Sequence, residues 1–294
     1  MLLPKFELHE PISINNALKL KQSYGSNARL MAGGTDVLVL LKKKVIATDT
    51  IISLSKIRDL TQIKKSDNEI TIGACVTMAK LIASPVIKEK FCALKKACEN
   101  LGNHLIQNRA TIGGNNCNAS PAGDTIPALL IYDAKVLIES TNGKRSLPIR
   151  NFFKGPGKTD LAQNEILTGF KIPIPSVNSG AHYIQLGKRK SSEINVVNAG
   201  SFLEYNPDTK KIINARVALG SVAATPIRAD KTEAVLKNQT VSTDLFHKAG
   251  ETAKNEDCKP IDDFRGSASY RQAMIGVLTK RTLQAAFEQA TLVV

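Results

Sequence analysis

The sequence predicts an α+β fold in three consecutive parts, which we place at residues 1–55, 56–175 and 176–294. Two observations support this prediction. Strand and helix patterns are mixed up to about residue 175, whereas the last part reads as antiparallel strands followed by helices. The length of 294 residues, with 43% apolar and 22% charged residues, is enough for two or three ordinary globular domains.

The first part reads as a small β-α-β unit. Ser13 is suited to cap a helix that runs to Lys21. Residues 28–32 are typical of a buried strand, residues 37–41 predict a turn of helix, and residues 51–54 predict a second strand. A glycine pair therefore lies at the first turn from strand to helix.

The second part combines helices with a hairpin. Residues 69–73 predict a strand, Thr77 predicts a helix N-cap, and Pro85 marks the start of another helix. Apolar residues at spacings of four and three place one face of that helix in the core: Ile87, Phe91, Leu94, Cys98 and Leu101. Residues 135–149 predict a hairpin whose Asn-Gly pair suits a type I′ turn.

The third part begins with strands and ends with helices. Residues 202–205 and 212–219 predict two antiparallel strands joined by a turn of Asn, Pro and Asp. Helices are expected at three places: residues 231–236, residues 243–253, and a long helix capped by Ser267 or Ser269.

The net charge of +14 indicates an anionic partner or a charged surface. Lys and Arg occur in short groups along the chain, at 42–44, 64–65, 188–190 and 210–211, which we interpret as dispersed solvated charge. An electropositive docking or cofactor-binding face is the alternative. Aromatic residues are only 5% and Trp is absent, so the chain has few side chains on which the bases of a single-stranded nucleic acid could stack. We expect no nucleic-acid partner.

Cysteine use and hydropathy favour a reducing compartment. The five cysteines form an odd, scattered set without short paired spacing: Cys75, Cys92, Cys98, Cys117 and Cys258. That pattern argues against a disulfide framework. No apolar run approaches the roughly 20 residues that cross a bilayer, and no charged leader precedes an apolar core at the N-terminus. We expect a cytoplasmic protein without a membrane span.

The first candidate ligand site is the turn Ala32-Gly33-Gly34-Thr35-Asp36, which leads from a strand into a helix. Residues without a Cβ let the backbone approach a ligand closely. The first amides of a helix have no intrahelical acceptor and favour an anion, by about 0.3–1 kcal/mol in exposed geometry. Thr35 adds a hydroxyl group.

A second turn, Thr111-Ile112-Gly113-Gly114-Asn115, repeats the same pattern. If the two turns face one another, they form a cradle for a diphosphate, with Asn118, Ser120 and Asp124 beside it for sugar or ribityl hydroxyls. A valine at position 114 would then occupy ligand space and disfavour a positive φ. Neither turn is a dinucleotide fingerprint or a P-loop, so two simple tight turns are the alternative.

In these motifs the sequence resembles the FAD-binding medium subunit of the molybdenum hydroxylases, the family of xanthine dehydrogenases, carbon monoxide dehydrogenase and nicotinate dehydrogenase. The AGG motif stands at residues 32–36, and the TIGGN and ASP-x-x-D motifs stand at residues 111–115 and 119–124. The resemblance covers nearly the entire chain and continues in four further stretches: 165–167, 183–198, 215–220 and 263–271.

The resemblance implies a two-part FAD-binding unit of the vanillyl-alcohol-oxidase (PCMH) type, followed by a smaller α+β C-terminal domain. It implies that FAD is bound by Leu30, Met31, Ala32, Gly33, Gly34, Thr35, Asp36, Leu101, Thr111, Ile112, Gly113, Gly114, Asn115, Asn118, Asp124, Leu167 and Gln185. Leu101 and Leu167 can equally be plain core. Relatives often have Lys where Gln185 stands and Asp where Glu193 stands, which leaves the flavin potential and the electron acceptor open.

The resemblance also implies partner chains. The sequence lacks a cysteine set for a 2Fe–2S cluster, so clusters and molybdopterin are expected on a small iron–sulfur subunit and a large molybdenum subunit, in a single or doubled complex. NAD(P) or a ferredoxin-like protein is the expected terminal acceptor. The tripeptide at 119–121 is closer to hydroxylases of purines and other N-heterocycles, such as nicotinate, than to carbon monoxide enzymes.

No residue pattern indicates an acid–base catalyst or a metal site. The four histidines are scattered without a neighbouring nucleophile: His9, His104, His182 and His247. The redox chemistry then belongs to the flavin. Two alternatives stay open. One is a self-sufficient FAD-dependent oxidoreductase of the same superfamily, and the other is a non-catalytic anion-binding module, which the paired glycine turns do not favour.

Overall fold

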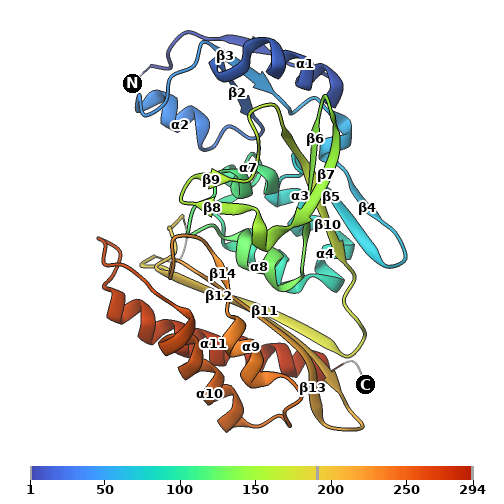
Figure 1. Cartoon of the computed structure of the whole chain (residues 1–294), viewed down its shortest axis with the longest axis vertical. Coiled ribbons are helices and arrows are strands. Elements are labelled where there is room, and N and C mark those ends of the chain that lie inside the picture. The colour runs from blue at the N-terminus through green and yellow to red at the C-terminus, as the bar shows by residue number, and fades with distance from the viewer. Residues whose placement is uncertain (1, 190–191, 293–294) are drawn as a thin grey trace.

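The computed structural model describes residues 2–189 and 192–292, and its elements form three layers along the long axis of the molecule (Figure 1). A small parallel sheet lies at one end, a five-stranded sheet with helices lies in the middle, and a four-stranded sheet covered by helices lies at the other end. This mixture of sheets and helices confirms the predicted α+β class.

The N-terminal unit is a parallel sheet in the order β1-β3-β2. Its elements are β1 (Glu7–His9), α1 (Ile14–Tyr24), β2 (Ala28–Met31), α2 (Val37–Lys42) and β3 (Thr50–Ser53). The predicted β-α-β unit is confirmed, and β1 is an additional strand. Ser13 caps α1 as predicted, because its Oγ accepts a hydrogen bond from the Asn16 amide at 3.2 Å.

The central unit is built on an antiparallel sheet in the order β4-β5-β10-β6-β7. Its strands are β4 (Ile63–Lys65), β5 (Glu69–Gly73), β6 (Lys135–Ser140), β7 (Gly143–Pro148) and β10 (Ile166–Pro173), and a separate ribbon pairs β8 (Phe153–Gly155) with β9 (Lys158–Thr159). Its helices are α3 (Met78–Ala83), α4 (Pro85–Lys90), α5 (Cys92–Asn100), α6 (His104–Gln107), α7 (Ile112–Cys117) and α8 (Thr125–Ile131). Thr77 caps α3, as its position before the helix predicted.

The single helix predicted after Pro85 is wrong, because α4 and α5 are separate helices. Phe91 leaves helical geometry between them, with φ −131° and ψ 49°. Its ring packs edge-on against Tyr132 at a centroid distance of 5.1 Å, and both rings are buried. The apolar positions that predicted one helical face are all buried. The sequence therefore predicted which residues are buried, but not that the helix is interrupted at Phe91.

The hairpin of β6 and β7 is confirmed, but the type I′ turn is wrong. Ser140 pairs with Gly143, which makes Thr141 and Asn142 the turn residues. A type I′ turn needs a positive φ at both of them, and neither has one. The Ser140 hydroxyl oxygen accepts a hydrogen bond from the Asn142 amide at 3.2 Å and stabilises the observed turn instead.

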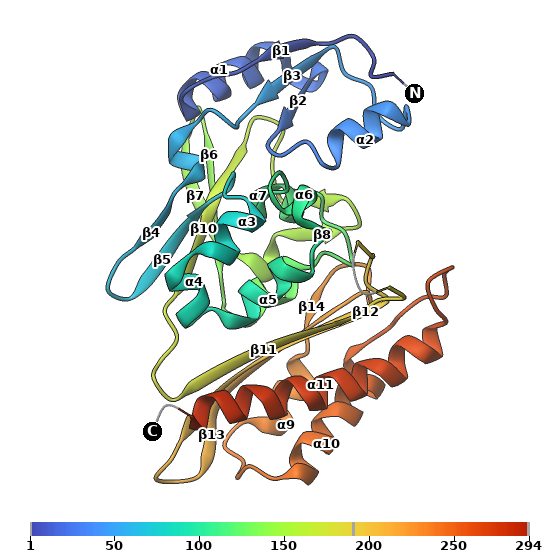
Figure 2. The same ribbon diagram turned by 180° about the vertical axis from the view of Figure 1, so that it is seen from behind.

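The C-terminal unit is an antiparallel sheet in the order β11-β12-β13-β14, covered by helices on one face (Figure 2). Its elements are β11 (Ser179–Leu186), β12 (Val197–Asn206), β13 (Lys211–Gly220), β14 (Ile227–Arg228), α9 (Asp230–Leu236), α10 (Thr243–Thr252) and α11 (Ala268–Thr291). The predicted order of strands before helices is confirmed. Of the two serines considered as caps for the long helix, Ser267 is the one whose side chain accepts from a helix amide, that of Tyr270.

The central and C-terminal units share a hydrophobic core. Helices α5 (Figure 2) and α8 (Figure 1) lie between the two sheets, and the buried Tyr183 and Phe202 of the C-terminal sheet belong to the same cluster as Tyr132. The N-terminal unit has a smaller core of its own, which Ile166 of β10 joins. The C-terminal sheet is therefore packed firmly enough to position residues of the central unit. No helix within residues 2–189 and 192–292 is long and apolar enough to cross a membrane.

Candidate functional site

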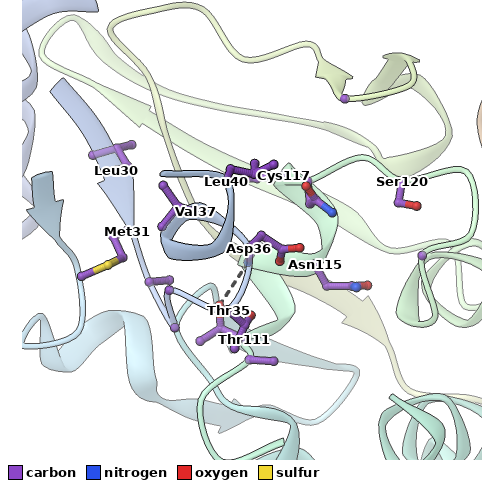
Figure 3. Close-up of a pocket in the computed structure, with 18 of the residues that line it drawn as sticks. Leu30, Met31, Thr35, Asp36, Val37, Leu40, Thr111, Asn115, Cys117 and Ser120 are labelled. Carbon is purple, nitrogen blue, oxygen red and sulfur yellow. Dashed lines mark hydrogen bonds between the residues drawn. The ribbon is translucent and has the colours of Figure 1, made fainter. Parts of the chain in front are cut away.

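A cleft of about 1060 Å³ separates the N-terminal unit from the helices of the central unit. Both glycine turns line it, together with much of the 118–124 loop and residues 192–194. In the close-up, Thr35 and Asp36 lie beside Thr111 and Asn115 (Figure 3). The volume slightly exceeds the roughly 300–1,000 Å³ typical of small-molecule sites. The cleft can therefore hold a large, extended ligand.

Two glycines allow the first turn to approach the second. A Cβ on Gly33 would lie 1.9 Å from the carbonyl oxygen of Arg109. Arg109 lies just before the segment that forms the second turn. Only glycine permits this contact between the two segments. Gly34 has a φ of +78°, a left-handed conformation that favours glycine. Both residues are thus explained by the backbone alone, before any ligand is considered.

The first turn has backbone amides without a protein acceptor, on residues that line the cleft. The first hydrogen bond of α2 runs from the Leu38 amide to the Gly34 carbonyl, at 3.2 Å. Within the described part of the chain, the amides of residues 34–37 have no protein acceptor, and these residues line the cleft. The Asp36 side chain makes no capping hydrogen bond either. Such a group of free donors at the start of a helix suits an anion.

The second turn uses its amides within the protein. The amide of Ile112 donates to the Val76 carbonyl at 3.0 Å, Gly113 to the Ala74 carbonyl at 2.8 Å, Gly114 to Thr111 Oγ1 at 3.1 Å, and Asn115 to the Thr111 carbonyl at 3.0 Å. A Cβ on Gly113 would lie 2.6 Å from the Ala74 carbonyl oxygen, so this glycine serves packing. The second turn is therefore a wall of the cleft with few amides to offer.

Gly114 differs from the other three glycines. Its φ is not positive, so the expected strain for a β-branched residue is wrong. A Cβ there would meet only Thr111 Oγ1, at 3.0 Å, and Gly114 lines the cleft. Apart from Thr111 Oγ1, no side chain of a non-adjacent residue lies within 4 Å of that Cβ position, so the remaining space beside Gly114 is open to a ligand.

Side chains around the second turn supply donors that its amides do not. Asn115 Oδ1 accepts hydrogen bonds from the Thr125 amide at 3.3 Å and from the Thr125 hydroxyl at 2.7 Å, which leaves Asn115 Nδ2 as a donor. Thr111 Oγ1 and Ser120 Oγ each accept from a backbone amide, so each hydroxyl proton is available to a ligand. Asn118 is exposed on the cleft wall.

Charge in the cleft is not predominantly positive. Lys21 and Arg29 lie among the lining residues, and burial, with Arg29 nearby, lowers the pKa of Lys21. The lining carboxylates are Asp36, Asp124, Glu165 and Glu193. Glu165 is paired with Arg145 at 2.6 Å and Glu193 with Arg189 at 2.8 Å. The chain's charge of +14 is thus not concentrated here, and an anion would depend on neutral amides and hydroxyls.

Among the lining carboxyl groups, Asp124 has the most strongly shifted pKa. Burial raises the pKa of its carboxyl to about 6, although Asn195 donates a hydrogen bond to Oδ1 at 2.9 Å. Partial burial also raises the pKa of Asp36. Each carboxyl can accept a hydrogen bond from a ligand hydroxyl.

The structure brings thirteen of the residues implied by the resemblance together on the cleft: Leu30, Met31, Ala32, Gly33, Gly34, Thr35, Asp36, Leu101, Thr111, Gly114, Asn115, Asn118 and Asp124. Ile112, Gly113, Leu167 and Gln185 lie outside its lining. Leu167 and Ile112 are buried in the central core, and Gln185 lies on β11 opposite Asn198. Direct ligand contact stays a prediction at all seventeen positions.

Several lining residues have no sequence signal. Lys21 and Arg29 come from the N-terminal unit, residues 161–163 follow β9, and Ile194 comes from the C-terminal part. They meet only in the folded chain. Gly157 also lines the cleft, and its Gly-Pro-Gly context with a φ of +69° is a turn that the sequence could have indicated. Within the described residues, no group of three or more His, Cys, Asp or Glu is placed to hold a metal ion.

Comparison with known families covers most of the chain. Residues 4–175 match the model of the FAD binding domain in molybdopterin dehydrogenase, and residues 182–286 match that of the CO dehydrogenase flavoprotein C-terminal domain. The carbon monoxide dehydrogenase medium chain of Hydrogenophaga pseudoflava is 30% identical, covering 98% of this chain and 99% of that protein. A putative xanthine dehydrogenase FAD-binding subunit of Escherichia coli K12 is also 30% identical, covering 96% of each.

Solved structures agree over the same length. Carbon monoxide dehydrogenase from Hydrogenophaga pseudoflava, in a form lacking the Mo-pyranopterin moiety, matches with a TM-score of 0.94 at 29% identity, covering 98% of this chain and 99% of that chain. Quinoline 2-oxidoreductase from Pseudomonas putida 86 matches with a TM-score of 0.92 at 25% identity, covering 99% of each chain. The expected fold, a FAD-binding unit followed by a smaller C-terminal domain, is confirmed.

Proposed function

We propose that this chain, which belongs to the family of FAD-binding subunits of molybdopterin dehydrogenases, holds one non-covalent FAD in its cleft and carries electrons from partner subunits to a terminal acceptor. The observation that supports this most is the row of free amides at residues 34–37, on a cleft large enough for a dinucleotide. Both halves of the chain match the family models, which agrees with an electron-transfer subunit.

Different residues of the cleft bind different parts of FAD in this proposal. The amides of residues 34–37 donate to the diphosphate, and Asn115 Nδ2 and the Thr111 hydroxyl add donors from the opposite wall. Asn118 and Asp124 bind hydroxyl groups of the polar chain. FAD supplies the exchange between one-electron and two-electron donors and acceptors, while the protein provides binding, orientation and electrostatics.

Partner chains complete the reaction in this proposal. A small subunit carries 2Fe–2S clusters and a large subunit carries the molybdenum cofactor, in a single or doubled complex. The names of two relatives support this, since each is a medium chain or a FAD-binding subunit. The five free cysteines agree with a reducing, cytoplasmic location. NAD(P) or a ferredoxin-like protein is the proposed acceptor.

The proposed substrate is an aromatic N-heterocycle, such as a purine or nicotinate. The tripeptide Ala119-Ser120-Pro121 supports this choice. Relatives named for carbon monoxide and for xanthine are equally similar, at 30% identity, so overall similarity does not decide between the two substrates.

Steady-state turnover tests the proposal. The purified chain, loaded with FAD, should pass electrons from a small donor to a dye but hydroxylate no heterocycle. The complex reconstituted with the iron–sulfur and molybdenum subunits should hydroxylate one of a purine, nicotinate and quinoline panel. Turnover by the lone chain at the rate of the complex would show a self-sufficient flavoenzyme instead. Turnover of carbon monoxide alone would overturn only the substrate class.

A further inference from the structure

The C-terminal unit holds the loop that follows the second glycine turn. Four consecutive residues of this loop, 121–124, each accept a hydrogen bond from it. Pro121 O accepts from the Ser221 amide at 2.8 Å, Ala122 O from Asn195 Nδ2 at 3.2 Å, Gly123 O from Asn198 Nδ2 at 3.5 Å, and Asp124 Oδ1 from Asn195 Nδ2 at 2.9 Å. These four hydrogen bonds tie the loop to residues outside the central unit, in addition to its own local bonds.

Asn195 is the residue that reaches the ligand-facing carboxylate. It precedes β12 and is only 1% exposed. Its side-chain nitrogen Nδ2 lies within hydrogen-bond distance of two acceptors, Ala122 O and Asp124 Oδ1. Because an acceptor requires a donor, it is the nitrogen of this amide, and not its oxygen, that faces them. Its backbone carbonyl accepts a hydrogen bond from the Ser221 hydroxyl at 3.3 Å, which fixes the main chain at this point.

The position of Asn195 carries a cost that stability alone does not explain. With its nitrogen turned to the loop, Asn195 Oδ1 is buried without a regular hydrogen bond in the described part of the chain, and the Tyr183 hydroxyl is the polar group that interacts with this side chain. A buried acceptor without a donor loses its hydration without compensation. A smaller apolar residue would avoid that loss, but it would leave the Asp124 carboxylate without this donor.

Asp124 can serve a ligand because its side chain is not used to cap a helix. It stands at the N-cap of α8 but its side chain does not cap the helix. Asn195 donates to Oδ1, and the backbone amide of Asp124 itself is a further donor to this carboxylate. A carboxylate accepts several hydrogen bonds, so acceptor capacity remains for the cleft that Asp124 lines.

We propose that Asn195 is a positioning residue for the cofactor: it orients the Asp124 carboxylate toward a ligand hydroxyl without touching the ligand. This inference rests on the proposed FAD site and deepens it. It makes the C-terminal unit part of the cofactor-binding apparatus, through a side chain that does not line the cleft.

A double-mutant cycle on the FAD dissociation constant of the full chain tests this. Asn195→Ala should raise Kd about tenfold, since a hydrogen bond to a charged group is lost. In an Asp124→Ala background the same change should alter Kd less than twofold. In an Asp124→Asn background, whose amide oxygen still accepts from Asn195, the effect should persist. Equal effects of Asn195→Ala in the Asp124→Ala and wild-type backgrounds would overturn the inference.

Two further variants separate positioning from folding. Ser201 lies on β12, outside the cleft lining, and its hydroxyl forms a buried hydrogen bond with the Thr282 hydroxyl at 2.7 Å. Ser201→Ala removes this bond and should leave the Kd for FAD unchanged. Asn195→Asp keeps the shape of the side chain and loses the donor, so it should weaken binding at least as much as Asn195→Ala. A wild-type chain that binds no FAD would overturn the proposed function. Wild-type binding with unchanged Kd in both Asn195 variants would overturn only this inference.

Discussion

The two glycine turns have nearly the same sequence pattern but different roles in the structure. Both lead into a short helix and both line one cleft. In the first turn, the amides of residues 34–37 have no protein acceptor in the described chain. In the second, the amides of residues 112–115 are all bonded to Val76, Ala74 or Thr111 oxygens. A Gly-Gly pair therefore indicates that another group approaches the backbone closely. Whether that group is protein backbone or a ligand has to be identified separately.

The difference follows from what each turn packs against. The second turn lies against the chain after β5, where Thr77 and Thr111 form an isolated bridge, and Gly113 admits the neighbouring backbone of Ala74. The first turn touches protein mainly through Gly33, and its helix start faces the cleft. One turn is thus a donor surface, and the other is a packed wall that carries donor side chains.

The largest effect is expected at the contact between the turns. Gly33→Ala would place a Cβ 1.9 Å from the Arg109 carbonyl oxygen, where only backbone can move, and should cost more than about 3 kcal/mol of unfolding free energy. Gly114→Val should change stability by about 1 kcal/mol or less but abolish FAD binding, because its side chain enters the cleft. Urea unfolding and acid-released flavin would measure both. Equal stability losses would remove the distinction.

The acidic residues beside the two turns should differ in their pH dependence. Because burial raises the pKa of Asp124 from 3.8 to about 6, the folded chain binds this proton more tightly than the unfolded chain. Stability should therefore fall as pH rises from about 4 to about 6, by at most about 3 kcal/mol. Asp124→Asn should remove that fall, whereas Asp36→Asn should change it less, because partial burial raises the pKa of Asp36 by a smaller amount. Urea midpoints across this pH range, without FAD, would decide; identical profiles for wild type and Asp124→Asn would contradict the assignment.

A smaller effect is expected at Gly34, the glycine of the first turn with a φ of +78°. Gly34→Ala should destabilise the chain by about 1–2 kcal/mol through backbone strain. Gly34→Asn is the matched control, because Asn tolerates this conformation better, and it should lose less. Thermal melts of the two variants would compare them. An alanine variant as stable as wild type would show that the turn relaxes to another conformation.

The smallest effects should separate the two threonines. Thr111→Val removes the cap that accepts the Gly114 amide at 3.1 Å and should cost about 1 kcal/mol. Thr35→Val removes a hydroxyl with no protein partner in the described chain, so stability should stay within about 0.5 kcal/mol while FAD affinity falls. Paired melts and FAD titrations would measure this contrast. A reversed pattern would mean that the roles of the turns are exchanged.

The features that could be predicted from the sequence are those that depend on residues close together in the chain. The caps at Ser13 and Thr77 depend on nearby residues and were predictable, as was the pairing of two glycine turns on one cavity. The break at Phe91 was not, because it depends on packing against Tyr132, far along the chain. Asn195 also gave no signal, since its contact with Asp124 joins residues 71 positions apart.

Hydrogen–deuterium exchange of the chain with and without FAD tests the central claim most directly. Without FAD, the amides of residues 34–37 should exchange rapidly, and those of residues 112–115 should already be protected by their bonds to protein oxygens. FAD should protect residues 34–37 strongly and change residues 112–115 little. Protection gained only at residues 112–115, or at neither turn, would contradict the assignment of the first turn as the donor surface for the cofactor.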